Sequence, residues 1–580
     1  MNRSVLLQRK IFRGKACREP TRPVTPLRQW ILCLSYTLPM SSSEEILAAL
    51  RRYWGYDSFR PLQERIVNTL LRGHDTCVVM PTGGGKSLCY QLPAAMLPGK
   101  TVIVVSPLIA LMHDQVMQLE QMGIPAGLLN SSLPGNEQFR VARQAAEGKY
   151  RLLYLSPERL ARADTIPWLK RVPVSQFAID EAHCISEWGH EFRPDYRQLS
   201  TLRVQFPDLP IAAFTASATR RVRHDIIDQL RLRNPDKYIA SFHRSNLRYV
   251  IKECESGTQS MLLVSALRHY AGSNVIVYAP TINQVGYTVA FLESQGIPAI
   301  PYHGKMESAD RKRNQERWMS DEVRVLVGTI AFGLGINKPS VRAVIHLALP
   351  KSLEQYYQEA GRAGRDGQPS DCTLLWQRRD VGLLAYFIDQ TEDPAEKQRG
   401  WQRYRDITGY AQSRICRHRQ ICLHFGETPK WRSCGTCDVC GSSPEWFSAG
   451  NDVYVRPDRK SASPAGSRRK ASRPAPQSAI PEGSSELREY LRIWRHDTAK
   501  KQGIPAFTVM HDTSLDDLCR VMPESLAALR QVYGFGDRKT ERYGREIVAA
   551  IKQFRGKAQA AKGMEGKASD QEESIRVETT

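Results

Sequence analysis

MPTGGGKS, residues 80–87, is the stretch that decides how the first half of this chain is expected to fold. The apolar run Cys77–Met80 leads into it and the helix-compatible run Ser87–Leu92 follows it, which gives the order strand, glycine turn, helix start. Three consecutive glycines let backbone N–H groups approach an anion closely. The positive end of the following helix faces the same anion. The stretch therefore predicts a phosphate-binding loop.

Two side chains at the end of this loop suit a nucleotide. Lys86 would reach the terminal phosphates, and the Ser87 hydroxyl would ligate Mg²⁺. The loop departs from the strict pattern at one position, because Met80 stands where a glycine is expected five residues before Gly85. The alternative is a structural glycine turn between two elements, but the Gly-Lys-Ser ending favours the nucleotide site.

Short apolar runs that alternate with helical stretches predict an α/β fold. Parallel strands buried on both faces have this near-continuous apolar character. The first set of runs is Val102–Ser106, Leu152–Ser156, Phe177–Asp180 and Ile211–Thr215. The second set is Val275–Ala279, Ala299–Tyr302, Val323–Gly328, Val344–Leu349 and Cys372–Trp376. Two sets, of which only the first has a phosphate loop, predict two lobes with a cleft between them.

An acidic pair follows one of the predicted strands. The sequence Asp-Glu-Ala-His, residues 180–183, comes directly after the apolar residues Phe177–Ile179. At the C-terminal end of a strand beside the phosphate loop, Asp180 is placed to hold Mg²⁺ through water. Glu181 would orient and deprotonate the attacking water. A solvated strand end is the alternative, and the phosphate loop upstream argues against it.

Composition and charge favour a polyanionic partner. The 580 residues suit three or four domains, and Lys and Arg outnumber Asp and Glu by 82 to 60, for a formal net charge of +22. This excess suits nucleic acid, and charge that serves solubility alone is the alternative. No apolar run reaches the roughly 20 residues that a bilayer span needs.

One dense group of cysteines points to a metal. Cys434, Cys437 and Cys440 form two overlapping C-x₂-C steps, and Cys416 lies 18 positions before the first of them. This usage suits a reducing compartment with a metal site rather than a disulfide scaffold. Four thiolates would form a closed, structural zinc site. Cys422 is a rival ligand, and free or redox-active cysteines are the alternative.

From about Glu44 to Cys440 the order of motifs resembles the RecQ family of DNA helicases. The most discriminating segment is CISEWGHEFRPDY, residues 184–196, which resembles the aromatic-rich loop of that family. The other matching segments are, in chain order, YDSFRPLQ at 56–63, VVSPLIALMHDQ at 104–115, FTASAT at 214–219, YHG at 302–304, GTIAFGLGINKP at 328–339 and YQEAGRAGRDG at 357–367. The resemblance implies an α/β fold of two tandem RecA-like motor lobes with parallel sheets. A helical zinc-binding subdomain and a small all-α domain would follow.

The resemblance assigns nucleotide contacts to named residues. Tyr56 and Arg60 would sandwich the adenine and Gln63 would read its edge, since an aromatic face and a guanidinium both stack on a base. The residues that would bind ATP are Tyr56, Arg60, Gln63, Thr82, Gly83, Gly84, Gly85, Lys86 and Ser87. Mg²⁺ would be held by Ser87 and Asp180.

The resemblance also places Gln358, Arg362 and Arg365 opposite the γ-phosphate across the cleft. An arginine there stabilises charge in the transition state only when the lobes close. The expected catalytic residues are Lys86, Asp180, Glu181, Gln358, Arg362 and Arg365. Without the family, the spacing of Arg362 and Arg365 would place both on one basic helix face.

DNA contact and its coupling to hydrolysis are expected in the aromatic loop and the second lobe. Trp188 and Phe192 would stack on exposed bases, and neighbouring polar residues would relay that contact to the metal site. The expected residues are Trp188, His190, Phe192, Arg193 and Thr329. The alternative, that the aromatics belong to the core, is opposed by a glycine and four charged residues among them.

The C-terminal part of the chain both follows and departs from the family. The family pattern points to Cys416, with Cys434, Cys437 and Cys440, as the zinc ligands. Fuller members carry a winged-helix domain after these cysteines, and its β-hairpin is the usual strand-separating wedge. Only a basic linker rich in Ser, Pro and Arg follows here. The helical segment from Ser484 to about 555 resembles the HRDC domain, a single-strand-binding module, with a purely structural helical bundle as the alternative.

The N-terminal residues are expected to lie outside the fold. They are basic and contain the apolar run Trp30–Leu38, which a signal or transit peptide would also have. No small-residue cleavage site follows, so a non-structural extension is favoured, with Met40 as an alternative first residue. The run Ser41–Glu45 predicts a helix start, with a capping serine and acids in the first turn.

Together these features predict seven segments. They are 1–43, a basic disordered extension; 44–238, the ATP-binding lobe; 239–385, the second lobe; 386–440, the zinc subdomain; 441–482, the linker; 483–556, the HRDC-like domain; and 557–580, a disordered tail.

The predicted activity is that of an ATP-dependent 3′-to-5′ DNA helicase in repair or recombination, with ATP, Mg²⁺ and Zn²⁺ as cofactors. Its expected partners are single-stranded and forked or partial duplex DNA, with other repair or single-strand-binding proteins, and no membrane. An RNA helicase of the same motor class is one rival, and a DNA-binding ATPase that anneals or remodels strands is another. The expected location is the cytoplasm, with the nucleoid, in a bacterium, or the nucleus in a eukaryote; the former is preferred.

Overall fold

The computed structural model describes residues 42–131, 133–189, 191–329, 338–441, 443–448, 484–502, 504 and 506–555. All of them belong to the compact unit that begins at Met40. Most of the predicted N-terminal extension, most of the predicted linker and the predicted C-terminal tail lie outside the described residues. Within these ranges, no helix combines the length and the apolar character that crossing a membrane requires.

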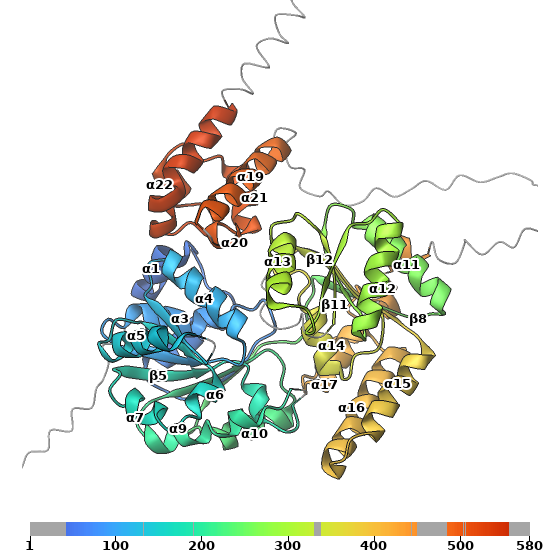
Figure 1. Ribbon diagram of the computed structural model, residues 1–580, viewed down its shortest axis with the longest axis horizontal. Helices are drawn as coiled ribbons and strands as arrows, with labels where there is room; N and C mark the ends of the chain where they lie inside the picture. Colours follow the sequence, from blue (N-terminus) through green and yellow to red (C-terminus); the bar gives the residue numbers. More distant parts are fainter. Residues whose placement is uncertain are drawn as a thin grey trace, which may run out of the picture. The chain divides into compact units, whose positions relative to one another are not determined.

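In the described residues, seven parallel strands form the first sheet (Figure 1). Across the sheet they are β3 (Ala126–Leu129), β4 (Leu152–Leu155), β2 (Thr101–Val105), β5 (Val174–Ile179), β6 (Ile211–Thr215), β1 (Thr76–Val79) and β7 (Asp236–Ile239). Neighbouring residues along a strand point to opposite faces. Val78 and Val104 therefore join one core cluster, while Val79 and Val105 join another. Both faces of the sheet are thus buried, as the near-continuous apolar runs predicted.

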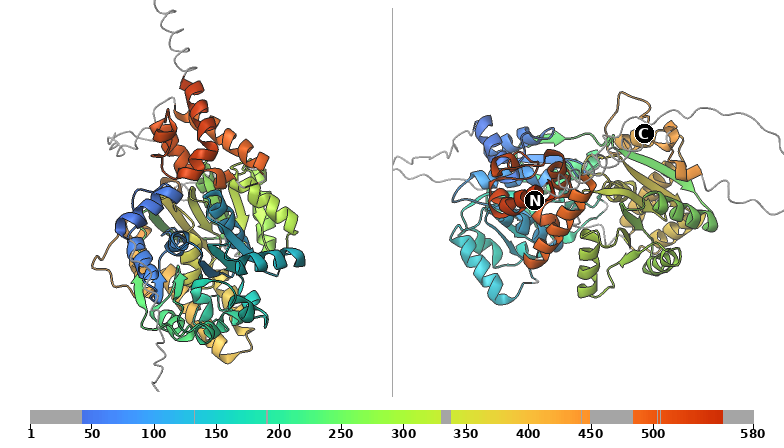
Figure 2. Two further views of the ribbon diagram at one scale, coloured as in Figure 1. Left: turned by 90° about the vertical axis from the view of Figure 1, so that its left-hand side faces the viewer. Right: turned by 90° about the horizontal axis from the view of Figure 1, so that it is seen from above.

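Helices cover the two faces of this sheet (Figure 1 and Figure 2). They are α1 (Ser43–Trp54), α2 (Gln63–Leu71), α3 (Lys86–Met96), α4 (Ile109–Gln121), α5 (Gly135–Ala146), α6 (Pro157–Leu160), α7 (Thr165–Leu169), α8 (Pro194–Arg197), α9 (Ser200–Gln205), α10 (Arg220–Gln229) and the 3₁₀ helix η1 (Ala182–Ile185). The predicted helix start near Ser41 is confirmed. The Ser42 hydroxyl accepts from the Glu45 N–H and the Glu45 carboxylate accepts from the Ser42 N–H, which is a capping box.

The second sheet has six parallel strands among the described residues. In order they are β10 (Ala299–Tyr302), β11 (Val325–Gly328), β9 (Asn274–Tyr278), β12 (Val341–His346), β13 (Ser370–Trp376) and β8 (Leu247–Glu253). Its helices are α11 (Ser256–His269), α12 (Ile282–Ser294), α13 (Ser308–Met319) and α14 (Leu353–Ala360). The expected fold class, two α/β lobes with parallel sheets, is confirmed.

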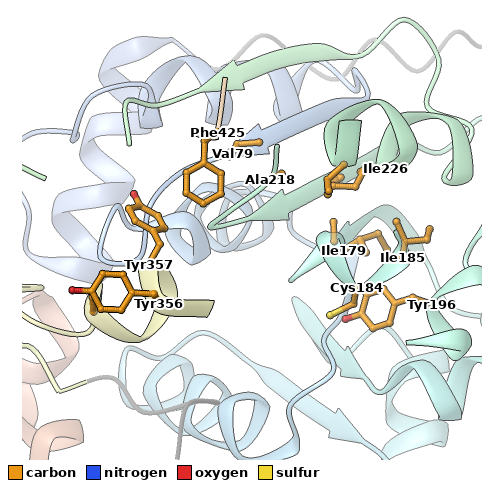
Figure 3. Close-up of a cluster of buried hydrophobic side chains, with 14 of the residues drawn as sticks. Val79, Ile179, Cys184, Ile185, Tyr196, Ala218, Ile226, Tyr356, Tyr357 and Phe425 are labelled. Atoms are coloured by element: carbon orange, nitrogen blue, oxygen red, sulfur yellow. The ribbon is translucent and has the colours of Figure 1, made fainter. Parts of the chain in front are cut away.

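A helical subdomain follows the second sheet. It comprises α15 (Arg378–Asp389), α16 (Pro394–Gln412), α17 (Arg417–His424) and the short turn η3 (Asp438–Cys440). Phe425, just after α17, stacks on Phe242 with ring centroids 4.4 Å apart and lies 5.0 Å from the ring of Tyr357 on α14. Figure 3 shows Phe425 and Tyr357 in the buried cluster that also contains Val79 of the first sheet. Aromatic packing therefore fixes the subdomain at the junction of the two lobes.

The predicted linker begins later than composition suggested. Residues 445–448 form the short helix α18 (Glu445–Ser448), and Trp446 is buried with the core of the second lobe. A buried tryptophan supplies enough apolar surface to order these residues, which composition alone had assigned to a flexible linker.

The last described segment is a helical domain with its own core cluster. Its helices are α19 (Ser484–Gln502), α20 (Ala506–Val509), α21 (Asp512–Val521), α22 (Leu526–Leu529) and one over residues 537–555.

Candidate nucleotide and metal sites

Three sequence motifs meet at one edge of the first sheet. The phosphate loop follows β1, the acidic pair follows β5, and the segment Ala216–Thr219 follows β6. Strands β5, β6 and β1 are consecutive in the sheet and parallel, so their carboxyl ends lie side by side. This edge is where open α/β sheets bind ligands. It opens into a cavity of about 1140 Å³ that is lined by residues of both lobes.

The phosphate loop has the backbone that a cradle for an anion requires. Gly83 and Gly85 both have positive φ angles, 85° and 80°. A Cβ on Gly85 would lie 2.3 Å from Nε2 of Gln63, so a side chain there would displace the Gln63 amide from the loop, and the positive φ would strain the backbone. Helix α3 starts at Lys86, whose Nζ donates to the Met80 carbonyl at 3.3 Å. The lysine is thus folded back along the loop, beside the place where phosphates would bind.

The three residues expected to bind adenine surround this loop. The Arg60 guanidinium donates to the Gly83 carbonyl, and Gln63 Nε2 donates to the Gly85 carbonyl at 3.1 Å. Tyr56 is half-buried at the rim of the same cavity, and its ring is stacked on Tyr533. Their roles toward a base stay predictions.

The acidic pair is buried beside the loop. Asp180 is only 6% exposed, and burial, together with the neighbouring Glu181 carboxylate, raises the pKa of Asp180 to about 7, against the opposing effect of Lys86. A cation bound nearby would favour the ionised form of this group. The Ser87 hydroxyl lines the same cavity. An oxygen-rich set of this kind suits Mg²⁺.

Glu181 has an uncommon backbone for a non-glycine residue, with φ of 46°. Its carboxylate lies 3.3 Å from Nδ1 of His183, and the same ring nitrogen lies 2.9 Å from the Thr215 hydroxyl of β6. The acidic motif is therefore tied directly to the neighbouring strand end.

Arginines from the second lobe reach the phosphate loop. A Cβ on Gly83 would lie 3.5 Å from the Arg365 Cα, so this residue lies against the loop. Burial, with the nearby charges of Arg362 and Arg244, lowers the pKa of Arg365 to about 9. Like charges held together in a buried place are unfavourable unless an anion joins them. The arrangement therefore suits a polyphosphate.

Arg244, between β7 and β8, was missed by the sequence reasoning. Its guanidinium donates to the Thr82 carbonyl at 2.8 Å and to the Gly364 carbonyl at 3.0 Å. It thus joins the phosphate loop to the turn that carries Arg365. No motif contains it, and only its contacts identify it.

The helix-face interpretation of Arg362 and Arg365 is wrong. Helix α14 ends at Ala360, and both arginines lie in the turns that follow it. Gly364, between them, has a φ of 54° and takes the chain out of the helical path. Gln358, still on α14, donates to the Ser217 hydroxyl at 2.9 Å, so it contacts the end of β6 across the cleft.

The aromatic loop exposes one of its two predicted stacking residues. Trp188 is 41% exposed, which is inconsistent with a place in the core. The Arg221 guanidinium carbon lies 3.0 Å and that of Arg399 5.5 Å from its ring centroid. Phe192 is half-buried, and Arg197 lies 5.4 Å from its ring.

The remaining coupling residues are partly described. Arg193 donates to the Pro107 carbonyl at 3.3 Å, within the first lobe. Thr329 follows β11, and its N–H donates to the Tyr302 carbonyl at 3.2 Å. His190 and residues 330–337 lie outside the described residues.

Four cysteines converge in the helical subdomain. The sulfur atoms of Cys416, Cys434, Cys437 and Cys440 all lie within 4.8 Å of one another. The Cys416–Cys437 and Cys434–Cys440 sulfur distances are 4.0 and 3.9 Å. Sulfurs around a tetrahedral zinc with Zn–S bonds of about 2.3 Å lie about 3.8 Å apart. Cys422 is buried outside this group, so the structure selects Cys416 over Cys422.

Comparisons with known proteins agree with this geometry along the chain. Residues 60–226 match the DEAD/DEAH box helicase family and 258–367 the helicase conserved C-terminal domain. Residues 378–441 match the RecQ zinc-binding family and 484–551 the HRDC domain. The ATP-dependent DNA helicase RecQ of Bacillus subtilis is 33% identical over 87% of this chain and 98% of its own length.

The chain belongs to the RecQ family.

Other relatives have higher identity, but the match covers less of each chain. The ATP-dependent DNA helicase RecQ of Haemophilus influenzae is 42% identical over 69% of this chain and 64% of its own length. The ATP-dependent DNA helicase Q-like 2 of Arabidopsis thaliana is 41% identical over 68% of this chain and 56% of its own. The chain thus spans less than two thirds of these two relatives.

In this RecQ-family chain we expect Cys437→Ala to remove zinc. The wild-type protein should contain about one zinc per chain, because four thiolates close a structural site, and the variant should lose most of it together with thermal stability. Elemental analysis of protein purified without added metal, with a melting curve, measures both. Cys422→Ala is the matched control and should keep its zinc. Full zinc in Cys437→Ala would show that the four thiols hold no metal.

Proposed function

We propose that this chain is an ATP-dependent DNA helicase that moves 3′ to 5′ on single-stranded DNA. One observation carries the proposal: the phosphate loop, the acidic pair and the second-lobe arginines line a single cavity between the lobes. Hydrolysis at such a place responds to the approach of the lobes, because the arginines come from one lobe and the loop from the other.

Each side chain has a task in this scheme. Lys86 and the loop N–H groups bind the β- and γ-phosphates of ATP. Ser87 directly, and Asp180 through water, would hold Mg²⁺, which offsets the charge of the phosphates. Glu181 orients the attacking water and accepts its proton. Arg362 and Arg365 stabilise the charge that spreads over the γ-phosphate oxygens in the transition state.

Two hydrogen bonds support coupling between hydrolysis and lobe movement. Gln358 contacts Ser217 across the cleft, and His183 links the acidic motif to Thr215 of the same strand end. Loss of the γ-phosphate would therefore be felt at the end of β6 through a contact from each lobe: Gln358 from the second and His183 from the first. The exposed Trp188, in the loop after the acidic motif, offers a ring on which a base of single-stranded DNA stacks.

The DNA partner is supported by charge as well as by family. The net charge of +22 favours a polyanion, and its contribution to binding weakens as the salt concentration rises, because releasing counterions from the DNA then gains less free energy. Contacts with other repair or single-strand-binding proteins, the role of the helical C-terminal domain on DNA and the cellular location stay predictions.

An unwinding assay tests the activity. Duplexes with a 3′ tail, a 5′ tail or a fork, made of DNA or RNA, are mixed with the full chain and ATP. We expect the 3′-tailed and forked DNA to open and the 5′-tailed DNA and the RNA duplexes to stay paired. DNA-stimulated ATP hydrolysis without strand separation would instead favour an annealing or remodelling ATPase. Preferential opening of RNA would favour an RNA helicase.

A further inference from the structure

The helical C-terminal domain touches the first lobe at several points, among them the Arg542–Gln121 hydrogen bond of 2.8 Å and the tight turn of residues 533–536. This turn meets the loop that follows α1. A Cβ on Gly55 would lie 2.6 Å from the Phe535 carbonyl carbon, and a Cβ on Gly536 would lie 2.7 Å from the Arg52 carbonyl oxygen. Two glycines therefore let two backbones touch at a distance that side chains would prevent.

The same contact brings Tyr533 onto Tyr56. The two ring centroids are 4.6 Å apart and the ring planes differ by 19°, so the rings are stacked face to face. Tyr56 also packs against the core cluster of the first lobe. Burial and the neighbouring Tyr533 phenol raise the pKa of Tyr56 above its usual range. Both tyrosines line the cavity that contains the phosphate loop.

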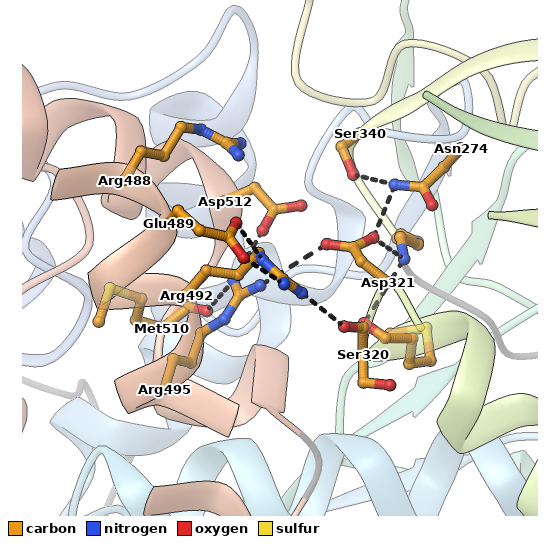
Figure 4. Close-up of polar contacts among 12 residues, drawn as sticks. Asn274, Ser320, Asp321, Ser340, Arg488, Glu489, Arg492, Arg495, Met510 and Asp512 are labelled. Atoms are coloured by element: carbon orange, nitrogen blue, oxygen red, sulfur yellow. Dashed lines mark hydrogen bonds and ion pairs between the residues drawn. The ribbon is translucent and has the colours of Figure 1, made fainter. Parts of the chain in front are cut away.

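The second lobe holds the same domain through charges (Figure 4). Arg495 of α19 is only 2% exposed, pairs with Asp512 at 2.6 Å and lies 3.9 Å from Asp321 of the second lobe. Asp321 in turn accepts from the buried Lys338 at 2.6 Å. Positive and negative groups alternate along this row, so the charges offset one another. The helical domain is therefore anchored on both lobes beside the cleft.

We propose, resting on the ATP site of the proposed function and on the adenine contact that the family resemblance predicts for Tyr56, that Tyr533 takes the place of the nucleotide base on Tyr56. Docking of the C-terminal domain and binding of the base then exclude each other, because a base cannot stack on the face of Tyr56 that Tyr533 already covers. The triphosphate binds elsewhere in the cavity, at residues 82–87, so the competition concerns the base alone.

The expected change in the affinity for ATP follows from the fraction of molecules in which the C-terminal domain is docked. If about nine molecules in ten are docked, the apparent affinity for ATP is about tenfold weaker than that of the undocked protein. Inorganic triphosphate has no base, so docking of Tyr533 leaves its affinity unchanged.

The test is calorimetric titration of the full chain with ATP and, separately, with inorganic triphosphate, both with Mg²⁺. Tyr533→Ala removes the ring. Gly536→Ala keeps the ring but adds a Cβ that would clash with the backbone carbonyls of the first lobe. Because Gly536 does not have a positive φ, the alanine should disturb docking without straining its own backbone. Tyr490→Ala is the control, since this tyrosine is 43% exposed on α19 of the same domain.

We expect both Tyr533→Ala and Gly536→Ala to bind ATP about three- to tenfold more tightly than the wild type. Their affinity for triphosphate, and both affinities of Tyr490→Ala, should stay at the wild-type values. Unchanged ATP affinity in both variants would overturn the competition and leave the proposed function standing. Weaker ATP binding in Tyr533→Ala would also overturn the competition, because it would mean that Tyr533 helps to bind the base. A wild-type protein that binds neither ligand would overturn the nucleotide site itself.

Discussion

Glu181→Gln is expected to abolish ATP hydrolysis while ATP still binds. The glutamine keeps the shape of the side chain but cannot accept the proton of the attacking water, and loss of a general base costs about 10²- to 10⁴-fold in rate. The phosphate loop and the second-lobe arginines are untouched, so the affinity for ATP should stay within about twofold. Steady-state hydrolysis with single-stranded DNA and an equilibrium ATP titration measure the two quantities.

Lys86→Ala is the companion variant. Lys86 would contact the phosphates before and during the reaction, so its loss should weaken nucleotide binding as well as turnover. Both variants should therefore lose ATP hydrolysis, but only Lys86→Ala should also bind ATP more weakly. Hydrolysis by Glu181→Gln at a rate near that of the wild type would show that another group activates the water.

Arg365→Ala should have the second large effect. Charge spreads over the γ-phosphate in the transition state, and an arginine supplied from across a cleft is worth about 10³-fold or more in turnover. Arg365 lies against Gly83 of the loop, and its lowered pKa of about 9 reflects burial and the neighbouring arginines. We expect DNA-stimulated hydrolysis to fall about 10³-fold, which is about 4 kcal/mol of transition-state stabilisation.

Two further variants define what this arginine does. Arg365→Lys keeps a charge but loses the planar fork, so it should recover only part of the rate. Arg378→Ala removes a surface arginine whose side chain is 88% exposed and should hydrolyse ATP like the wild type. A nearly normal rate in Arg365→Ala, with DNA present, would assign the transition-state charge to Arg362 or Arg244.

The strands that sequence reasoning found and those it missed differ in their place in the sheets. The predicted runs correspond to interior strands, apart from β10, and their boundaries lie within a few residues of the observed ones. The strands β3, β7 and β8 were not predicted, and all three lie at sheet edges. An edge strand such as β7, with the exposed residues Asp236 and Lys237, lacks a continuous apolar pattern because water reaches it.

The sequence by itself predicted the fold class, which the structure confirms, and the residues proposed for the nucleotide site. The phosphate loop and the acidic pair are contiguous motifs whose geometry depends on a few neighbouring residues, and buried parallel strands impose their apolar runs directly. The tertiary structure confirmed Cys416, which the family pattern had favoured over Cys422, as the fourth cysteine of the group. Only the tertiary structure decided that Arg244 joins the two lobes at the loop. It also decided that Tyr533 covers Tyr56. These are contacts between residues far apart in the chain, and they depend on how whole elements pack, which no local pattern of residue types encodes.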